Sequence, residues 1–344
     1  MSIFDLITAP ELTTYWEEMS QNREPYIGEE LFPNRQKLGL DLSWIKGSKG
    51  LPVELKLSAL DVQAVPRARI GFDRISTSMP FFKESMYVDE ELRQELNKVL
   101  ESTNQAYIDA ITNRIFDDEM TLIESAAVSR ERMRMMLLTT GVISLESNGQ
   151  AYTYDYGLST DQKPTVTKSW SDPTAPIIDD IRTWQDGRED ETGERPTRAI
   201  VSRKTWGYLL KNTEIRSAIW GNNSVAPVND TRLKQYLLDE LDLDVVRNSK
   251  RYRSVDGTSR AYVPDDVFVL FPIGELGNTW FGTTPEQSDL LSGSVANVRI
   301  VDTGVAVTTM KIADPVTVET KVTQICLPSF ERADQIVIAD VIAD

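Results

Sequence analysis

The sequence predicts a mixed α+β fold, and three observations lead to that prediction. Residues 104–138 contain neither proline nor glycine and repeat apolar residues at three- and four-residue steps, which is typical of a long amphipathic helix. Runs that alternate with period two flank this stretch and indicate β-hairpins. Residues 176–312 then alternate helical and strand-like segments. The chain therefore combines a long helix with hairpins and an α/β region.

The composition indicates an ordinary folded protein. With 344 residues and 40% hydrophobic residues, the chain is long enough for one large domain or two medium ones. No apolar run approaches the roughly 18 residues of a membrane span, and the opening residues show no leader pattern, so we expect no membrane contact and a protein that is made and kept in the cytosol. The single cysteine, Cys326, lies in an apolar run and is expected to be a small core residue.

Two further features exclude whole classes of function. The chain has no histidine, which removes the commonest general base and the commonest zinc ligand. The net charge of −16 argues against a sequence-independent nucleic-acid binder, because such proteins place Lys and Arg against phosphates. We therefore expect no catalytic residues, no cofactor and no metal.

We expect residues 1–35 to form an N-terminal arm. A short helix is expected from Ala9 to Met19 with Thr8 as its cap, followed by an extended segment that Pro25 and Pro33 interrupt. This segment carries apolar side chains that it cannot bury by folding on itself, so we expect a neighbouring subunit to cover them and to order the arm on assembly; a frayed terminus is the alternative. These side chains are Tyr26, Ile27, Leu31 and Phe32.

Residues 36–80 are expected to form an extended hairpin. Strands at 38–45 and 51–62 would be joined by a glycine-rich turn at Gly47–Gly50. Basic residues outnumber acidic ones here, which favours contact with an acidic patch on a neighbour; a solvated hairpin face is the alternative. The candidate interface residues on this hairpin are Trp44, Lys46, Lys49, Arg67 and Arg69.

The central part of the chain has the clearest signals. A helix is expected at 89–100, and the long helix at 104–138 would extend on the order of 50 Å before Gly141 ends it. The dipeptide Asn148-Gly149, between two alternating runs, predicts a second hairpin beside the end of this helix.

The remaining chain is expected to form an α/β region and returning strands. Helices are expected near 176–185, 204–212 and 231–241, and strands near 198–202, 243–247, 266–272 and 297–310, with a long loop at 273–293. The last strands, within 313–344, are expected to pair with the hairpin beside the long helix.

No motif in the sequence indicates catalysis. The glycines around Lys49 lack phosphate-loop spacing, and no helix follows them. Adjacent carboxylates such as Asp117, Asp118 and Glu119, Asp179 and Asp180, and Asp265 and Asp266 point in different directions on a helix or turn, so a solvated face is favoured over a hydrolase site. No acidic run has the spacing of a calcium loop.

The order of these parts resembles the HK97-type capsid fold of tailed-phage major capsid proteins, and within it the lambda-like major capsid protein E family. Local texture carries the resemblance at the end of the long helix, before and in the α/β region, and near the C-terminus. The matching stretches are RERMRMMLLTTGVISLESNG at 130–149, KSWSDPTAPIIDDIRTW at 168–184, DVFVLFPIGELGNTWFGTTPE at 266–286 and LPSFERADQIVIADVI at 327–342.

The resemblance implies a domain plan and a function. It implies an N-terminal arm (1–35), an E-loop hairpin (36–80), a P-domain with the spine helix (81–175 and 313–344) and an A-domain (176–312). It also implies self-assembly through hexamers and pentamers into an icosahedral virion shell that encloses double-stranded DNA, with a scaffolding protein, a portal and a decoration protein as partners. The alternatives are an encapsulin-like compartment protein and a carboxylate-dependent hydrolase.

Overall fold

The computed structural model describes residues 8–20, 23–46, 73–88, 90–100, 105–147, 149–221, 226–290, 296–314 and 316–343. The chain forms two compact units, each assembled from three separate segments. The first unit comprises 1–42, 76–133 and 278–329, and the second comprises 43–75, 134–277 and 330–344.

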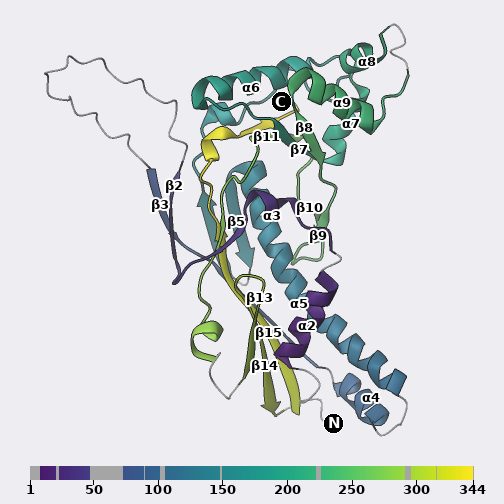
Figure 1. The fold of residues 1–344 in the computed structure, drawn as a ribbon, viewed down its shortest axis with the longest axis vertical. Coiled ribbons are helices and arrows are strands. Elements are labelled where there is room, and N and C mark those ends of the chain that lie inside the picture. The colour runs from purple at the N-terminus through teal and green to yellow at the C-terminus, as the bar shows by residue number, and fades with distance from the viewer. Residues whose placement is uncertain are drawn as a thin grey trace, which may run out of the picture. The chain divides into compact units, whose positions relative to one another are not determined.

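The first unit contains one sheet and several helices (Figure 1). Its helices are α2 (Ala9–Ser20), α3 (Ile27–Leu31), α4 (Glu90–Leu100) and α5 (Gln105–Thr140), of which α5 continues into the second unit. Its strands are β1 (Asn34–Gln36), β4 (Phe81–Tyr87), β12 (Thr279–Phe281), β13 (Asn297–Val301), β14 (Val305–Ala313) and β15 (Val316–Pro328).

The long strand β15 organises this sheet. It pairs antiparallel with β14 along 316–324, with β4 along 319–325 and with β12 along 326–328. β13 extends the sheet beyond β14, and β1 extends it beyond β12 in parallel. Because β15 has neighbours on both edges and is buried along most of its length, it is the central strand of the unit.

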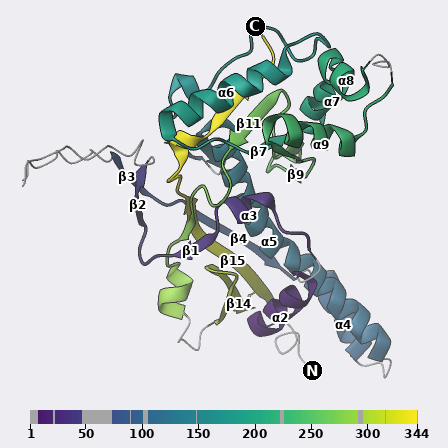
Figure 2. The ribbon, with the colours of Figure 1, turned by 45° about the horizontal axis from the view of Figure 1, so that its top comes forward.

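Helices α5 and α2 cover the same face of the sheet (Figure 2). The Gln324 side chain points to α5, because its amide donates to the Ala126 carbonyl over 3.0 Å. Thr320 shares that face by strand alternation, and it lies opposite Thr309 of β14. The first N–H of α2, on Ala9, donates to the Thr309 hydroxyl over 3.2 Å, so α2 lies on that face too.

Three sequence predictions for helices are confirmed. The observed α2, α4 and α5 agree with the expected 9–19, 89–100 and 104–138 within two residues. The end of α5 follows from Gly141, whose φ of +72° suits glycine and whose N–H donates to the Leu137 carbonyl over 2.9 Å. A Cβ at this position would lie 2.9 Å from Leu158 Cγ.

The two predicted hairpins have different outcomes. β5 (Val142–Ser147) and β6 (Gln150–Asp155) pair antiparallel with Gly149 at φ +73°, which confirms the hairpin after the long helix. β2 (Asp41–Lys46) pairs with β3 (Asp73–Ser78), whereas we had expected its partner at 51–62. The expected tip at 47–50 lies outside the described residues, so it stays a prediction.

The second unit is an α/β layer structure. Its four-stranded sheet has the order β16-β11-β7-β8, in which β11 is antiparallel to both neighbours and β7 is parallel to β8. The sheet strands are β7 (Arg198–Val201), β8 (Asp244–Arg247), β11 (Val267–Phe271) and β16 (Val337–Asp340), and a small hairpin consists of β9 (Arg251–Arg253) and β10 (Ser259–Ala261). The helices are α6 (Ile177–Thr192), α7 (Arg203–Lys211), α8 (Thr213–Trp220) and α9 (Asp230–Leu241).

Side-chain caps define where the helices of this unit begin. Ser202 accepts the N–H of Thr205 at the start of α7 over 3.2 Å, and Asn229 accepts the N–H of Arg232 at the start of α9 over 2.9 Å. The apolar faces of these helices pack on the sheet around Trp170, which is buried. The helices and strands expected between 176 and 272 are thereby confirmed, and α8, β9 and β10 are additions.

The expected assignment of the later strands was wrong. The loop expected at 273–293 contains β12, and β12, β13 and β14 join the sheet of β15 in the first unit, although 176–312 was expected to form one domain. Among the described residues, β15 and β16 pair with these sheets and not with the 142–155 hairpin. β15 is buried on both faces, as is typical of a central strand. Nothing in its sequence indicates which strands are its partners.

Candidate functional site

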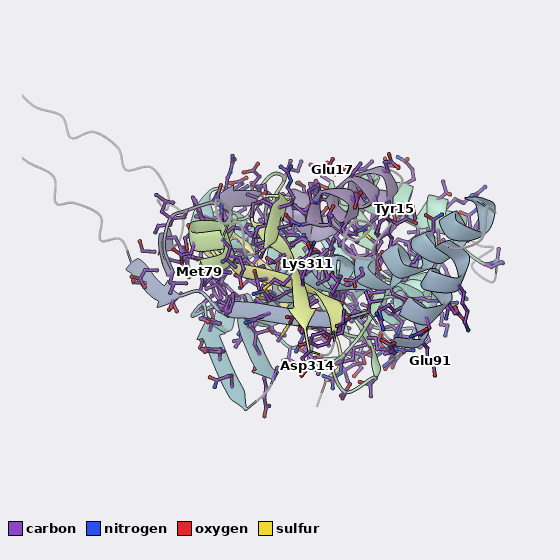
Figure 3. All side chains as sticks on the ribbon, turned by 90° about the horizontal axis from the view of Figure 1, so that it is seen from below. Tyr15, Glu17, Met79, Glu91, Lys311 and Asp314 are labelled. Atoms are coloured by element: carbon purple, nitrogen blue, oxygen red, sulfur yellow. The ribbon has the colours of Figure 1, made fainter. Side chains whose placement is uncertain are left out.

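Three of the carboxylates that the sequence offers as catalytic candidates, Asp117, Asp180 and Asp266, have clear structural partners. Asp117 accepts a hydrogen bond from the hydroxyl of Tyr15, labelled on α2 in Figure 3, over 2.8 Å. Asp180 accepts from the indole Nε1 of Trp170 over 2.9 Å. These carboxylates hold elements together rather than face each other across a cleft. In the part of the chain that the structure describes, no group of three or more His, Cys, Asp or Glu side chains is arranged to hold a metal ion.

Asp266 has the same structural character. It adopts φ +66° and accepts hydrogen bonds from the Tyr208 hydroxyl over 2.8 Å and from Lys204 Nζ over 2.6 Å. Its own N–H donates to the Thr205 hydroxyl over 3.1 Å. Asp266 therefore ties α7 to the start of β11.

A buried polar network joins α5 to the sheet of the first unit. Arg130 is 2% exposed, and its guanidinium donates to Gln324 Oε1 over 3.0 Å and to Asp302 Oδ2 over 2.6 Å. Glu131, fully buried, accepts the N–H of Gly28 over 3.1 Å and so fastens α3 to the same helix. Sequence reasoning missed these charges. The signal was present, because Arg130 follows Ala126 by four residues on the apolar stripe.

A second buried charge pair lies on the opposite face of β15. Lys321 Nζ contacts Glu286 Oε1 over 2.8 Å, and the Thr323 hydroxyl donates to Glu286 Oε2 over 3.0 Å. Burial by itself raises the pKa of Glu286, but the hydrogen bonds from Lys321, its own backbone and Thr323 outweigh burial and lower it. Glu286 is therefore held as a carboxylate inside the unit.

Glu119 of α5 differs from Glu286, because its surroundings raise the pKa of its carboxyl. It is 2% exposed, and its Oε2 has no hydrogen-bond partner among the described residues. Burial raises the pKa of this carboxyl to about 7; the nearby Thr320 hydroxyl lowers it in part, and the Asp118 charge raises it. The group thus titrates near neutrality in a chain that has no histidine.

The raised pKa of Glu119 predicts a pH-dependent stability. The folded subunit holds this proton more tightly than the unfolded chain, so the stabilisation is complete below about pH 4.5 and is lost as the pH rises to about 7. A rise in the pKa from 4.5 to about 7 corresponds to a change of roughly 3 kcal/mol in the free energy of unfolding. Glu119→Gln, which mimics the neutral carboxyl, is expected to match the original protein at low pH and to be more stable at about pH 8.

Urea denaturation of unassembled subunits across this pH range measures the effect. Glu124→Gln is the matched control, because Glu124 is exposed on the same helix and should leave the pH profile unchanged. An unaltered pH profile in Glu119→Gln would contradict the assignment.

The arm residues are divided between the interior and the surface. Leu31 and Phe32 are fully buried in the first unit, where the turn of α3 and the pairing of β1 with β12 carry them inward. The expectation that a neighbour must cover these two side chains is therefore wrong. Tyr26 and Ile27 are partly exposed, and they stay candidates for an intersubunit contact.

The hairpin residues are only partly described. Trp44 is 7% exposed and packs against Tyr156 in a tilted arrangement, with ring centroids 5.4 Å apart, so it anchors the hairpin base within its own chain. Lys46 ends β2, while Lys49, Arg67 and Arg69 lie outside the described residues. Their expected contact with a neighbour stays a prediction.

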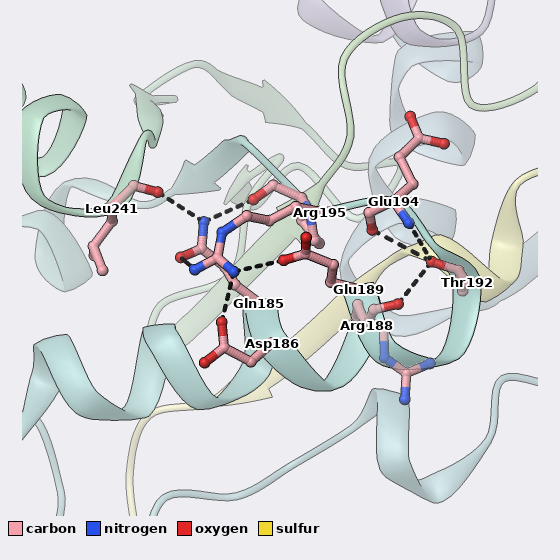
Figure 4. Close-up of polar contacts among 9 residues, drawn as sticks. Gln185, Asp186, Arg188, Glu189, Thr192, Glu194, Arg195 and Leu241 are labelled. Carbon is pink, nitrogen blue, oxygen red and sulfur yellow. Dashed lines mark hydrogen bonds and ion pairs between the residues drawn. The ribbon is translucent and has the colours of Figure 1, made fainter.

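The surface of the second unit also carries structural charge clusters. Figure 4 shows Arg195 donating to Asp186 over 2.5 Å and to Glu189 over 2.7 Å, beside the buried Gln185. Gln185 donates to the carbonyls of Pro196 and Leu241 over 2.7 and 3.1 Å. This cluster joins α6 to the segment before β7 and to the C-terminal end of α9, and it serves the fold rather than catalysis.

The sequence matches the family model described as Phage major capsid protein E over residues 8–341. The chain belongs to this family. It is the major capsid protein of a tailed phage, so its role is structural and copies of it form the virion shell. No helix in the described ranges is long and apolar enough to cross a membrane. Comparison with curated proteins gives no match.

Solved structures support the capsid fold. The chain is similar to a putative capsid protein of a prophage from Escherichia coli CFT073, with a TM-score of 0.55, 16% identity and coverage of 79% of this chain and 80% of that one. A phage-related protein from Bordetella bronchiseptica RB50 gives a TM-score of 0.56 at 12% identity, covering 97% of both chains. The capsid of cyanophage P-SCSP1u gives 0.51 at 9% identity, covering 94% and 90%. The predicted HK97-type fold is confirmed.

Proposed function

We propose that this capsid protein assembles through heterologous contacts into hexamers and pentamers, which close into an icosahedral shell around double-stranded DNA. The family match over 8–341 carries the proposal. In a heterologous contact one surface meets a different surface of the next copy, and rings form when the rotation closes.

The charge of the chain supports the role of a container. With a net charge of −16, the subunit repels DNA phosphates, so it encloses the genome without sequence-specific binding. We propose synthesis in the host cytoplasm and, as partners, a scaffolding protein, a portal and a decoration protein. No catalytic activity is part of this role.

Electron microscopy of the purified protein tests the proposal. We expect closed icosahedral particles built from rings of six and five subunits, and DNA-filled, tailed particles from an infected host. Empty shells that never associate with DNA or a tail would favour an encapsulin-like compartment. Protein that stays monomeric under all assembly conditions would contradict shell formation.

The basic E-loop hairpin is the proposed lateral contact, and its charges give a prediction. Changing Lys46 and Lys49 together to Glu is expected to reduce particle yield at least about tenfold while leaving the subunit folded, because like charges across an interface repel. Sedimentation velocity measures particle yield, and circular dichroism checks folding. The matched control changes the exposed Lys98 and Lys211 to Glu. Normal yield from the hairpin variant would show that these lysines make no electrostatic contact.

A further inference from the structure

The β9–β10 hairpin of the second unit is held in one shape by its own contacts. Ser254 N–H donates to the Thr258 carbonyl and Gly257 N–H to the Ser254 carbonyl, each over 2.8 Å, and Gly257 adopts φ +80°. The Asp256 carboxylate accepts from the backbone and hydroxyl of Thr258 over 2.9 and 2.6 Å. A turn fixed in this way is preorganised for binding.

This hairpin presents an apolar tip between cations. Val255 at the tip is 84% exposed. Arg251 and Arg253 on β9 and Arg260 on β10 are exposed beside it, while Asp256 is the acidic residue of the turn and pairs with Arg260 over 2.8 Å. An exposed valine with surrounding arginines suits an apolar groove with an acidic rim, and it suits nucleic acid less well, because phosphates offer nothing to the valine.

A groove of this character lies on the same unit, between α9 and β8. Its volume is about 720 Å³, and its apolar lining includes Trp206, Leu238 and Val246. Leu238 is a large apolar side chain of the surface helix α9, and it is 46% exposed. In the described part of the chain, β8 is an outer strand of its sheet, with β7 as its one neighbour.

The rim of the groove is acidic. Asp239, Asp242 and Asp244 are exposed at the end of α9 and the start of β8, and no ion pair joins them to a cation within the described ranges. Asp230 in the groove is already paired with Arg247 over 2.8 Å. Lys234 is the cation of the lining that has no such pair, so the carboxylates of the rim outnumber it.

We infer that the β9–β10 hairpin of one subunit docks into the groove between α9 and β8 of a second copy, with Val255 against Leu238 and the arginines against the acidic rim. In the single chain the hairpin tip is exposed and the groove is open. The tip and the groove therefore cover each other only when two copies come together. The contact is heterologous, and it rests on the proposed ring assembly.

Disulfide capture tests this contact in assembled particles. One chain carries Val255→Cys and another carries Leu238→Cys; the native Cys326 is buried and does not compete. After co-assembly and mild oxidation, a non-reducing gel is expected to show a covalent dimer, because a disulfide requires Cα atoms within about 7 Å. The control pairs Leu238→Cys with Ile273→Cys, a site of the same unit that is 68% exposed, and should give no dimer.

Particles that form normally without the Val255–Leu238 dimer would overturn the inference while leaving the proposed function intact. Failure of the unmodified protein to form particles would instead count against the proposed function. If the cysteine variants do not assemble, a pair of charge reversals tests the same contact. Arg253→Glu and Asp244→Lys should each lower particle yield about tenfold, and the variant that carries both should restore the yield. A double variant no better than the single ones would also overturn the inference.

Discussion

Lys321→Met is expected to lower the free energy of unfolding of the isolated subunit by about 3–5 kcal/mol. The variant leaves the Glu286 carboxylate inside the first unit without its cation, and the side chains of Lys321 and Glu286 are only 9% and 6% exposed. A charge left unpaired in such a place loses its hydration without compensation. Chemical denaturation monitored by tryptophan fluorescence measures the loss.

Two further variants separate charge from packing. Adding Glu286→Gln to Lys321→Met removes the unpaired charge, so the double variant should recover a large part of the stability. Lys168→Met is the control, since Lys168 and Asp172 form an exposed pair at 3.2 Å and its loss should cost less than about 1 kcal/mol. Equal losses from Lys321→Met and Lys168→Met would show that the buried pair is unimportant.

Leu122→Ala is expected to cost about 2–5 kcal/mol, since Leu122 is 5% exposed on the stripe of α5 that packs inside the first unit. A loss of this size is a large fraction of the roughly 5–15 kcal/mol that typically separates a folded protein from its unfolded state, so insoluble subunit and failed shell assembly are expected. Soluble expression and denaturation midpoint are the measurements. The exposed Glu124→Ala on the same helix should change the midpoint little. Unchanged stability of Leu122→Ala would mean that the stripe does not pack in the core.

Local patterns predicted the helices well and the strand partners poorly. The boundaries of α5 followed from apolar spacing and Gly141, because a helix satisfies its hydrogen bonds within one segment. Strand β2 has an equally clear alternation of apolar and polar residues, but its partner β3 begins only at Asp73. Alternation says which face a residue occupies and carries no information on which distant strand completes the ladder.

The interface residues show a similar limit. The composition of the arm correctly indicated that Leu31 and Phe32 need cover, but the cover comes from the chain's own first unit. Proline-interrupted segments cannot fold alone, and sequence does not say whether the same chain or a neighbour supplies the surface. The buried Arg130 was missed because a charged residue on an apolar stripe is read as an exposed one unless its partners, Asp302 and Gln324, are known.

The central position of β15 has a consequence for biosynthesis. β4 pairs with β15 in a register that joins Phe81 to Ile325, so the sheet closes across most of the polypeptide. At about 5–20 residues per second, a ribosome needs roughly 15–60 s to reach that point. Until then the nascent β4 lacks its central partner and offers an open edge to other chains. The sheet of the first unit is therefore completed only once β15 has been made, and cellular chaperones have their main opportunity before β15 emerges.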